Sequence, residues 1–178
     1  IDRREIGEFL TAMNREPHVG LRVNRLRLTA EEAAAKCGGK VSDTAPDIVL
    51  TESLDDAVKA GLSDGDWFVQ DEASRIVSAA LGARPGETVA DTCACPGGKS
   101  FSIAIDMHNE GDVYSFDLHK NKLSLIEKGA KNLGITVIRT EERDARKPKE
   151  ELIGKADRVL CDAPCSGLGV IAKKPDIR

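Results

Sequence analysis

The chain has 178 residues, a length that suits one domain or a domain with a small addition. Its 40% hydrophobic and 31% charged residues exclude a disordered chain, and no apolar run approaches the roughly 20 residues of a membrane span. The net charge of −4 and the 3% of aromatic residues offer neither a global attraction to nucleic acid nor a base-stacking platform, so any RNA contact depends on local basic clusters.

Residues 1–66 predict a small α+β subdomain that begins with a helix. Its expected elements are a helix over 2–14, a strand over 21–24, a helix over 29–37 capped by Thr29, a strand over 47–50 and a short helix over 54–60. A basic cluster at the first strand consists of Arg22, Arg25 and Arg27. This cluster is a candidate RNA-binding site, and a strand with solvated charges explains it equally well.

Residues 67–178 predict a second domain in which helices and strands alternate. A helix over 70–81 is expected to turn four apolar side chains inward, those of Ala73, Ile76, Val77 and Ala80. The expected strands cover 88–92, 112–116, 135–139 and 157–161, with helices over 99–107 and 120–132. This alternation is typical of βαβ units, so we predict an α/β fold with the first four strands of a Rossmann-like parallel sheet.

A glycine-rich loop follows the first strand of this sheet and leads into a helix. It runs from Cys93 to Lys99 and contains Cys93, Ala94, Cys95, Pro96, Gly97, Gly98 and Lys99. Glycines let the backbone approach a ligand closely, and the helix N-terminus offers N–H groups to an anion. A phosphate-binding P-loop would need glycine where Cys93 stands, and the dinucleotide pattern G-x-G-x-x-G is absent. We therefore predict a ligand loop of another kind.

Two aspartates follow later strands. Asp117 ends the second strand, 19 residues beyond Gly98, where doubly wound folds place the carboxylate that binds ribose hydroxyls. Asp144 follows the third strand, and a surface turn explains it nearly as well.

The fourth strand leads into a loop of small residues that contains Asp162 and Cys165. Since the carboxyl ends of parallel strands face one crevice, this loop and the loop from Cys93 to Lys99 are expected to share a site. Cys161, within the strand, is expected to be a buried apolar residue.

Five cysteines, an odd number with four in two tight groups, indicate reduced thiols and a cytoplasmic setting. Cys93 and Cys95 could converge with Cys161 and Cys165 on a zinc ion, but neither pair has the common CxxC spacing. The three histidines show no ligand spacing, so we predict no metal.

These motifs together resemble the RNA 5-methylcytosine methyltransferase family, which includes the bacterial 16S rRNA enzymes called Sun, Fmu or RsmB. The resemblance covers nearly the whole chain. Residues 21–24 are similar to the family's RNA-binding subdomain and 68–74 to a segment that precedes its cofactor domain. Residues 93–99 are similar to its cofactor loop and 162–167 to its motif IV. Cys95 stands where the family more often has alanine.

The resemblance implies a role for each candidate residue. Residues 93–99 would hold the methionine end of S-adenosyl-L-methionine, Asp117 the ribose hydroxyls and Asp144 the adenine amine. Asp162 would contact the methionine amine or the target cytosine, and Lys99 would position that base. Cys165 would assist product release.

In this family the attacking cysteine lies in a Thr-Cys motif beyond motif IV, and only 13 residues follow Cys165 here. The resemblance therefore places the main nucleophile beyond Arg178 and implies a chain truncated after motif IV, which binds the cofactor but does not methylate RNA alone. The open edge of its fourth strand is expected to favour self-association. Three alternatives remain: a non-catalytic RNA-binding or assembly module, a methyltransferase acting on tRNA rather than 16S rRNA, and a P-loop nucleotide enzyme, which Cys93 disfavours.

Overall fold

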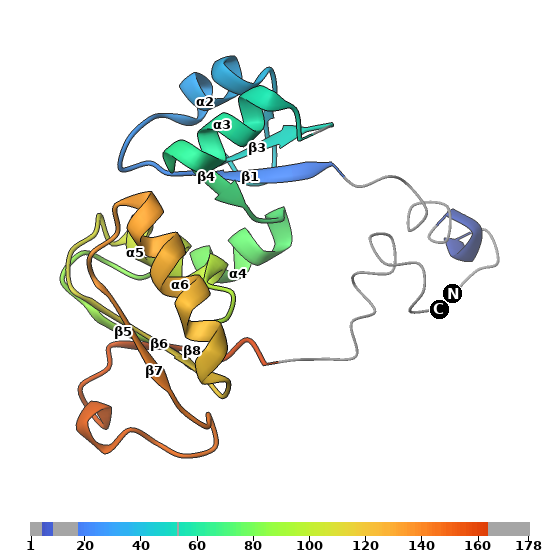
Figure 1. Cartoon of the computed structure of the whole chain (residues 1–178). Helices are drawn as coiled ribbons and strands as arrows, with labels where there is room; N and C mark the ends of the chain where they lie inside the picture. Colours follow the sequence, from blue (N-terminus) through green and yellow to red (C-terminus); the bar gives the residue numbers. More distant parts are fainter. Residues whose placement is uncertain (1–4, 9–17, 53, 164–178) are drawn as a thin grey trace. The chain divides into compact units, whose positions relative to one another are not determined.

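The computed structural model describes residues 5–8, 18–52 and 54–163, and Val19–Ala163 form one compact unit that contains two sheets (Figure 1). Of the N-terminal helix expected over 2–14, only residues 5–8 are described, and they are helical. Within the described part of the chain, no helix combines the length and apolarity that crossing a bilayer requires.

Two expectations fall beyond Ala163, where the description ends. Cys165, with residues 164–167 of motif IV, lies outside the described residues, whereas Asp162 and Ala163 lie within them. Arg178, the residue beyond which the attacking cysteine is expected, lies outside them as well. The role of Cys165 and the position of the nucleophile therefore stay predictions.

The first sheet is antiparallel and has the strand order β2-β3-β1-β4. Its strands are β1 (Val19–Val23), β2 (Lys40–Val41), β3 (Ile48–Thr51) and β4 (Trp67–Val69). Two helices accompany it, α2 (Ala30–Cys37) and α3 (Asp56–Asp64). Because β4 pairs with β1, Trp67–Val69 belong to this sheet and not, as the sequence suggested, to the second domain. The division of the chain into domains 1–66 and 67–178 otherwise stays a prediction.

Helix α2 begins where the sequence predicts. The Thr29 side chain accepts a hydrogen bond from the Glu32 backbone N–H, and the Glu32 carboxylate accepts one from the Thr29 backbone N–H, which forms a capping box. Gly38 ends the helix in the left-handed conformation, with a φ of 66°.

The second sheet is parallel, with the order β7-β6-β5-β8. Its strands are β5 (Thr88–Asp91), β6 (Asp112–Asp117), β7 (Ile138–Glu142) and β8 (Arg158–Leu160), and its helices are α4 (Glu72–Leu81), α5 (Gly98–Asp106) and α6 (Lys120–Leu133), with a 3₁₀ turn η1 (Glu150–Leu152). The sheet thus has four strands, as predicted, although β7 begins three residues later than the strand predicted over 135–139. In the described residues, β8 pairs on one side only, so self-association through that edge stays a prediction.

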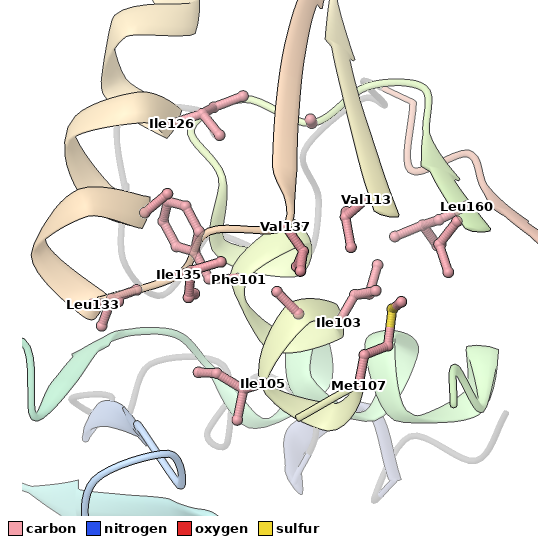
Figure 2. Packing of buried hydrophobic residues seen from close by; sticks show 14 of the residues in the cluster. Phe101, Ile103, Ile105, Met107, Val113, Ile126, Leu133, Ile135, Val137 and Leu160 are labelled. Carbon is pink, nitrogen blue, oxygen red and sulfur yellow. The ribbon is translucent and has the colours of Figure 1, made fainter. Parts of the chain in front are cut away.

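The core of the second sheet is a continuous apolar layer between the strands and helices α5 and α6. Figure 2 shows the side chains of helix α5 and its end packed against those of the strands and of α6. Ile135 and Val137 also lie in this core, although they precede β7. The strand predicted over 135–139 is therefore displaced, because these buried side chains belong to a connection rather than to the ladder.

The inward face predicted for α4 is wrong. Ile76 and Val77 are 50% and 42% exposed, and Ala73 and Ala80 are exposed as well. The buried residues of the helix are Arg75 and Ser78. Arg75 determines the rotation of the helix because it forms ion pairs with Asp47, before β3, and Asp106, at the end of α5.

The opposite face of the parallel sheet carries an apolar hollow of about 330 Å³. Ala90, Phe116 and Val159 line its floor, and residues 143–156 line its rim. Side chains alternate between the two faces of a strand, so the buried Leu160 points into the core while Val159 points into the hollow. The hollow lies mainly against the face of the sheet, and Thr92, directly after β5, also lines it.

Candidate functional site

The loops at the carboxyl ends of three parallel strands meet through direct backbone hydrogen bonds. Thr92 N donates to the carbonyl oxygen of Leu160 at 2.9 Å, which joins the ends of β5 and β8. Ala94 N donates to the carbonyl oxygen of Phe116 at 2.8 Å, which joins the loop after β5 to β6. The loop from Cys93 to Lys99 is therefore held between its two neighbouring strands, as the shared crevice predicts.

Gly97 gives this loop its shape. It is the N-cap of α5 with a φ of 115°, and no side chain caps the helix, so the first N–H groups have no partner of that kind. A Cβ atom at Gly97 would come within 2.4 Å of Cζ of Phe101. The loop thus provides what an anionic group requires, namely close backbone approach and an uncapped helix N-terminus.

A buried polar chain supports the loop from below. Ser115 and Ser100 share a hydroxyl hydrogen bond of 2.8 Å, and Ser100 Oγ donates to Asp91 Oδ2 at 2.7 Å. Asp91 Oδ1 is buried without a hydrogen-bond partner among the described residues. Burial raises the pKa of Asp91 to about 6, although the hydrogen bond from Ser100 opposes the shift.

The original chain should lose stability as the pH rises and the buried Asp91 carboxyl ionises. Replacing Asp91 by asparagine, which does not ionise, should remove this loss. A raised pKa favours the neutral carboxyl, so its contribution is full below pH 3.8 and is lost as the pH rises through about 6. Two pKa units correspond to roughly 3 kcal/mol. The free energy of unfolding is measured by urea titration at pH 4 and at pH 7.5. Between these pH values the original chain should lose about that much more stability than Asp91→Asn does. The exposed Asp43→Asn should show no such difference, and an equal pH response in both variants would refute a raised pKa at Asp91.

Gln70 holds the beginning of α5 from the side of the first sheet. Its Nε2 donates to the carbonyl oxygen of Gly98 at 3.1 Å, and its Oε1 accepts from Ser102 at 2.7 Å. Gln70 was not among the site residues predicted from the sequence. Its position directly after a strand and before a helix cap was the available indication.

Asp117 lies beside the loop, as expected. It ends β6, and its Oδ1 accepts a hydrogen bond of 2.9 Å from the His119 backbone N–H. Burial and the charge of the neighbouring Asp117 carboxylate raise the pKa of Cys95 to about 11, so its thiol stays protonated at neutral pH.

Lys99 and Asp162 are brought together across the crevice. Lys99 Nζ lies 2.7 Å from Asp162 Oδ2 and 3.4 Å from Ser74 Oγ. The loops after β5 and β8 thus share an ion pair, with Lys99 on the first loop and Asp162 on the second.

Asp144 is already engaged by a neighbour. Arg146 binds both of its carboxylate oxygens, with distances of 2.7–3.1 Å, and this hydrogen bonding lowers the pKa of Asp144 to about 2. The Arg143 N–H donates to the carbonyl oxygen of Asp117 at 2.9 Å, so the segment that holds Asp144 begins beside the end of β6. Its role toward an adenine amine stays a prediction.

One of the three arginines predicted to contact RNA cannot do so in this fold. Arg22 is 0% exposed and lies 2.9 Å from Asp47 and 3.1 Å from Asp106. Arg27 donates to the backbone carbonyl oxygens of Asp64 and Asn132 from an exposed position. Arg25 is about half exposed. The prediction of RNA contacts is therefore restricted to Arg25 and Arg27.

The exposure of the cysteines in the second domain differs from the prediction at Cys161. Cys161 is exposed, which contradicts the prediction of a buried side chain, because β8 ends one residue earlier. Cys93 and Cys95 are partly exposed, and Cys165 is outside the described residues. No group of three metal-binding side chains occurs in the part of the chain that the structure describes.

A family model described as 16S rRNA methyltransferase RsmB/F matches residues 78–178. A probable ribosomal RNA small subunit methyltransferase B of Bacillus subtilis is 43% identical over 168 residues, which is 91% of this chain and 38% of that protein.

Two solved structures share the fold. The crystal structure of PH0851 has a TM-score of 0.89 at 34% identity and covers 99% of this chain and 42% of its own. A methyltransferase homolog from Pyrococcus horikoshii has a TM-score of 0.75 at 28% identity and covers 93% of this chain and 56% of its own. The chain thus spans about two fifths of the length of the Bacillus protein and of PH0851.

Proposed function

The chain belongs to the RsmB/F family of 16S rRNA methyltransferases, an S-adenosyl-L-methionine-dependent family, and we propose that it is the cofactor-binding part of an enzyme that forms 5-methylcytosine in 16S rRNA. The observation that carries this proposal is that backbone hydrogen bonds hold the loop after β5 to the ends of β6 and β8, at an uncapped helix N-terminus. We propose a cytoplasmic protein whose partner is RNA.

The residues of the crevice suit the chemical groups of S-adenosyl-L-methionine. The N–H groups at the start of α5 suit the carboxylate of its methionine end, and the Asp117 carboxylate suits two ribose hydroxyls. Asp91 Oδ1, buried and unpartnered among the described residues, is an acceptor available beneath the same loop. When bound, the cofactor supplies a methyl group on a positively charged sulfur.

The target carbon explains why a thiol and a lysine are needed nearby. Carbon 5 of cytosine is a poor nucleophile until a thiolate adds to carbon 6 and makes an enamine-like adduct. In this proposal Lys99 and Asp162, already paired at 2.7 Å, orient the base, and Cys165 assists release of the methylated product. No Thr-Cys motif follows Cys165 in this chain. We therefore propose that the 178-residue chain alone binds the cofactor and does not methylate RNA.

Replacing Asp117 by alanine tests the cofactor site. The loss of a charge-assisted hydrogen bond should cost roughly 1.5–3 kcal/mol, which is about a ten- to hundredfold loss of affinity. Calorimetric titration with S-adenosyl-L-methionine measures this change. Asp112→Ala, at the opposite end of the same strand, is the matched control and should leave the affinity unchanged. Equal affinities of Asp117→Ala and the original chain would contradict the ribose role.

A further inference from the structure

Gln70 joins the first sheet to the beginning of helix α5. It directly follows β4, and its backbone N–H donates to the carbonyl oxygen of Gly20 in β1 at 3.0 Å. A Cβ atom at Gly20 would come within 2.4 Å of the Gln70 carbonyl oxygen, so glycine is required for this close approach. The main chain of Gln70 is thus fixed by β1, and its side chain extends to α5.

The side-chain amide of Gln70 has one orientation in this contact. A carbonyl oxygen only accepts, so the amide nitrogen must face the carbonyl oxygen of Gly98, 3.1 Å away. The amide oxygen then accepts from the hydroxyl of Ser102 at 2.7 Å. Gln70 is 5% exposed and Ser102 is 0% exposed, so water has little access to either group. The two bonds therefore hold the amide in one place.

The Gly98 carbonyl group belongs to the same peptide unit as the Lys99 N–H group. A trans peptide unit is planar, so its C=O and N–H bonds point in opposite directions. The Phe101 N–H donates to the carbonyl oxygen of Gly97 at 2.8 Å, which is the first bond of the helical ladder. The Lys99 N–H comes before this bond, so it lies at the uncapped end of α5. A bond that fixes the Gly98 carbonyl group therefore also fixes the direction of the Lys99 N–H.

We propose that Gln70 is a positioning residue of the cofactor site, which aims the Lys99 backbone N–H at the carboxylate of the cofactor. This inference rests on the function proposed above. Gln70 acts through the Gly98–Lys99 peptide unit, and its donated hydrogen bond also polarises this unit, which makes the Lys99 N–H a stronger donor to an anion. The Lys99 side chain is engaged separately, since its ammonium group lies 2.7 Å from Asp162.

A purely structural role of Gln70 would have a different consequence. If Gln70 only held α5 against the first sheet, its loss would weaken the binding of every ligand of the crevice alike. A positioning role affects only ligands that place an anionic group at the start of α5. Decarboxylated S-adenosylmethionine keeps the adenosine, the sulfonium and the amine and lacks only the carboxylate, so it distinguishes the two roles.

The variants are designed to remove one hydrogen bond at a time. Ser102→Ala removes the donor to the Gln70 amide oxygen and leaves the bond to Gly98 in place. Adding Gln70→Met, whose side chain has a similar length and no polar hydrogen, then removes the bond to Gly98 as well. Ser102→Ala is the required background, because a free Ser102 hydroxyl can donate to the carbonyl oxygen four residues before it, that of Gly98, and replace the lost bond.

Calorimetric titration of the original chain and both variants with the two ligands tests the proposal. Ser102→Ala should bind S-adenosyl-L-methionine within about twofold of the original chain, because the bond to Gly98 remains. The double variant should bind it about tenfold more weakly, the effect of one hydrogen bond, and should bind the decarboxylated cofactor as tightly as Ser102→Ala does. That unchanged affinity also shows that the double variant is folded. Equal losses for both ligands, or no loss for either, would overturn the proposal.

Nuclear magnetic resonance of the chain without cofactor tests the same contact independently. The amide proton of Lys99 should move to lower frequency when Gln70→Met is added to Ser102→Ala, because its peptide unit is then less polarised. An unchanged Lys99 signal would refute the contact. Failure of the original chain to bind S-adenosyl-L-methionine would count against the proposed function and against the role toward the carboxylate. The Lys99 signal would still decide whether Gln70 orients the peptide unit.

Discussion

Asp47→Ala is expected to lower the free energy of unfolding by about 3–5 kcal/mol, because it removes the more deeply buried of the two carboxylates that Arg22 and Arg75 share and leaves both charges to Asp106. Arg22 Nη1 and Arg75 Nη2 lie 2.9 and 2.7 Å from Asp47 Oδ2. The three side chains are only 0%, 10% and 5% exposed for Arg22, Arg75 and Asp47. Urea denaturation followed by circular dichroism measures the change.

The exposed pair of Lys40 and Asp43 provides the matched control. Its nitrogen and oxygen are 2.9 Å apart, as short as in the buried pair, but both side chains are at least three-quarters exposed. Asp43→Ala should therefore change the stability by less than about 1 kcal/mol. Similar losses in the two variants would mean that Asp47 contributes no more than a surface charge.

The pH dependence of the same network follows from its charges. Burial tends to raise the pKa of Asp47, but hydrogen bonds from Arg75 and the charge of Arg22 outweigh it, so the pKa lies below its usual value. A lowered carboxyl pKa gives stability that is present above the unfolded pKa and lost as the pH falls. Burial lowers the pKa of Arg22 to about 10, against the attraction of Asp47, so the arginine remains charged at neutral pH.

Gly97→Ala is expected to reduce the affinity for S-adenosyl-L-methionine by about a hundredfold, or roughly 3 kcal/mol. The φ of 115° at Gly97 is unfavourable for any side chain, and the new methyl group would meet Phe101. The ring cannot move aside, because it packs edge-on against Phe68 at 5.5 Å and also contacts Gly129. The loop must therefore shift. Calorimetric titration measures the affinity.

Gly129→Ala separates packing from loop geometry. Its Cβ would also come within 2.4 Å of Cζ of Phe101, but Gly129 lies inside α6 and outside the cofactor loop. Overpacking should cost each variant about 1–3 kcal/mol of stability. Only Gly97→Ala should also lose cofactor affinity, and an equal loss in Gly129→Ala would show that the ring rather than the loop controls binding.

Elements with strong local determinants could be predicted from the sequence. The cap at Thr29 and the glycine at 38 fix the ends of α2, and the alternation of helices and strands gives the parallel sheet. The three short or displaced strands could not be found in this way. β2 and β4 have two and three residues, too few to show a period, and the core takes up Ile135 and Val137 before β7 begins.

The positions of charged side chains were the least predictable. Arg22 and Arg75 look like surface residues in the sequence. Asp47 lies 25 residues from Arg22 and 28 from Arg75. Asp106 lies 84 residues from Arg22 and 31 from Arg75. Such distant pairing leaves no local pattern. It also explains the error in α4, since the buried arginine turns Ile76 and Val77 outward. The placement of the loop residues, by contrast, was predictable because they follow the strand ends directly, and their roles stay predictions.

The charge network joins elements of both sheets, since Arg22 lies in β1 and Asp106 at the end of α5. Asn24 adds two hydrogen bonds of 2.9 Å, to the carbonyl oxygens of Gly65 beside the first sheet and of Leu133 at the end of α6. These contacts tie the two sheets together at several points. If the chain binds RNA as proposed, it should therefore act as one platform, and the cost of bringing a cytosine into the crevice would fall on the RNA, which would have to bend or expose the base.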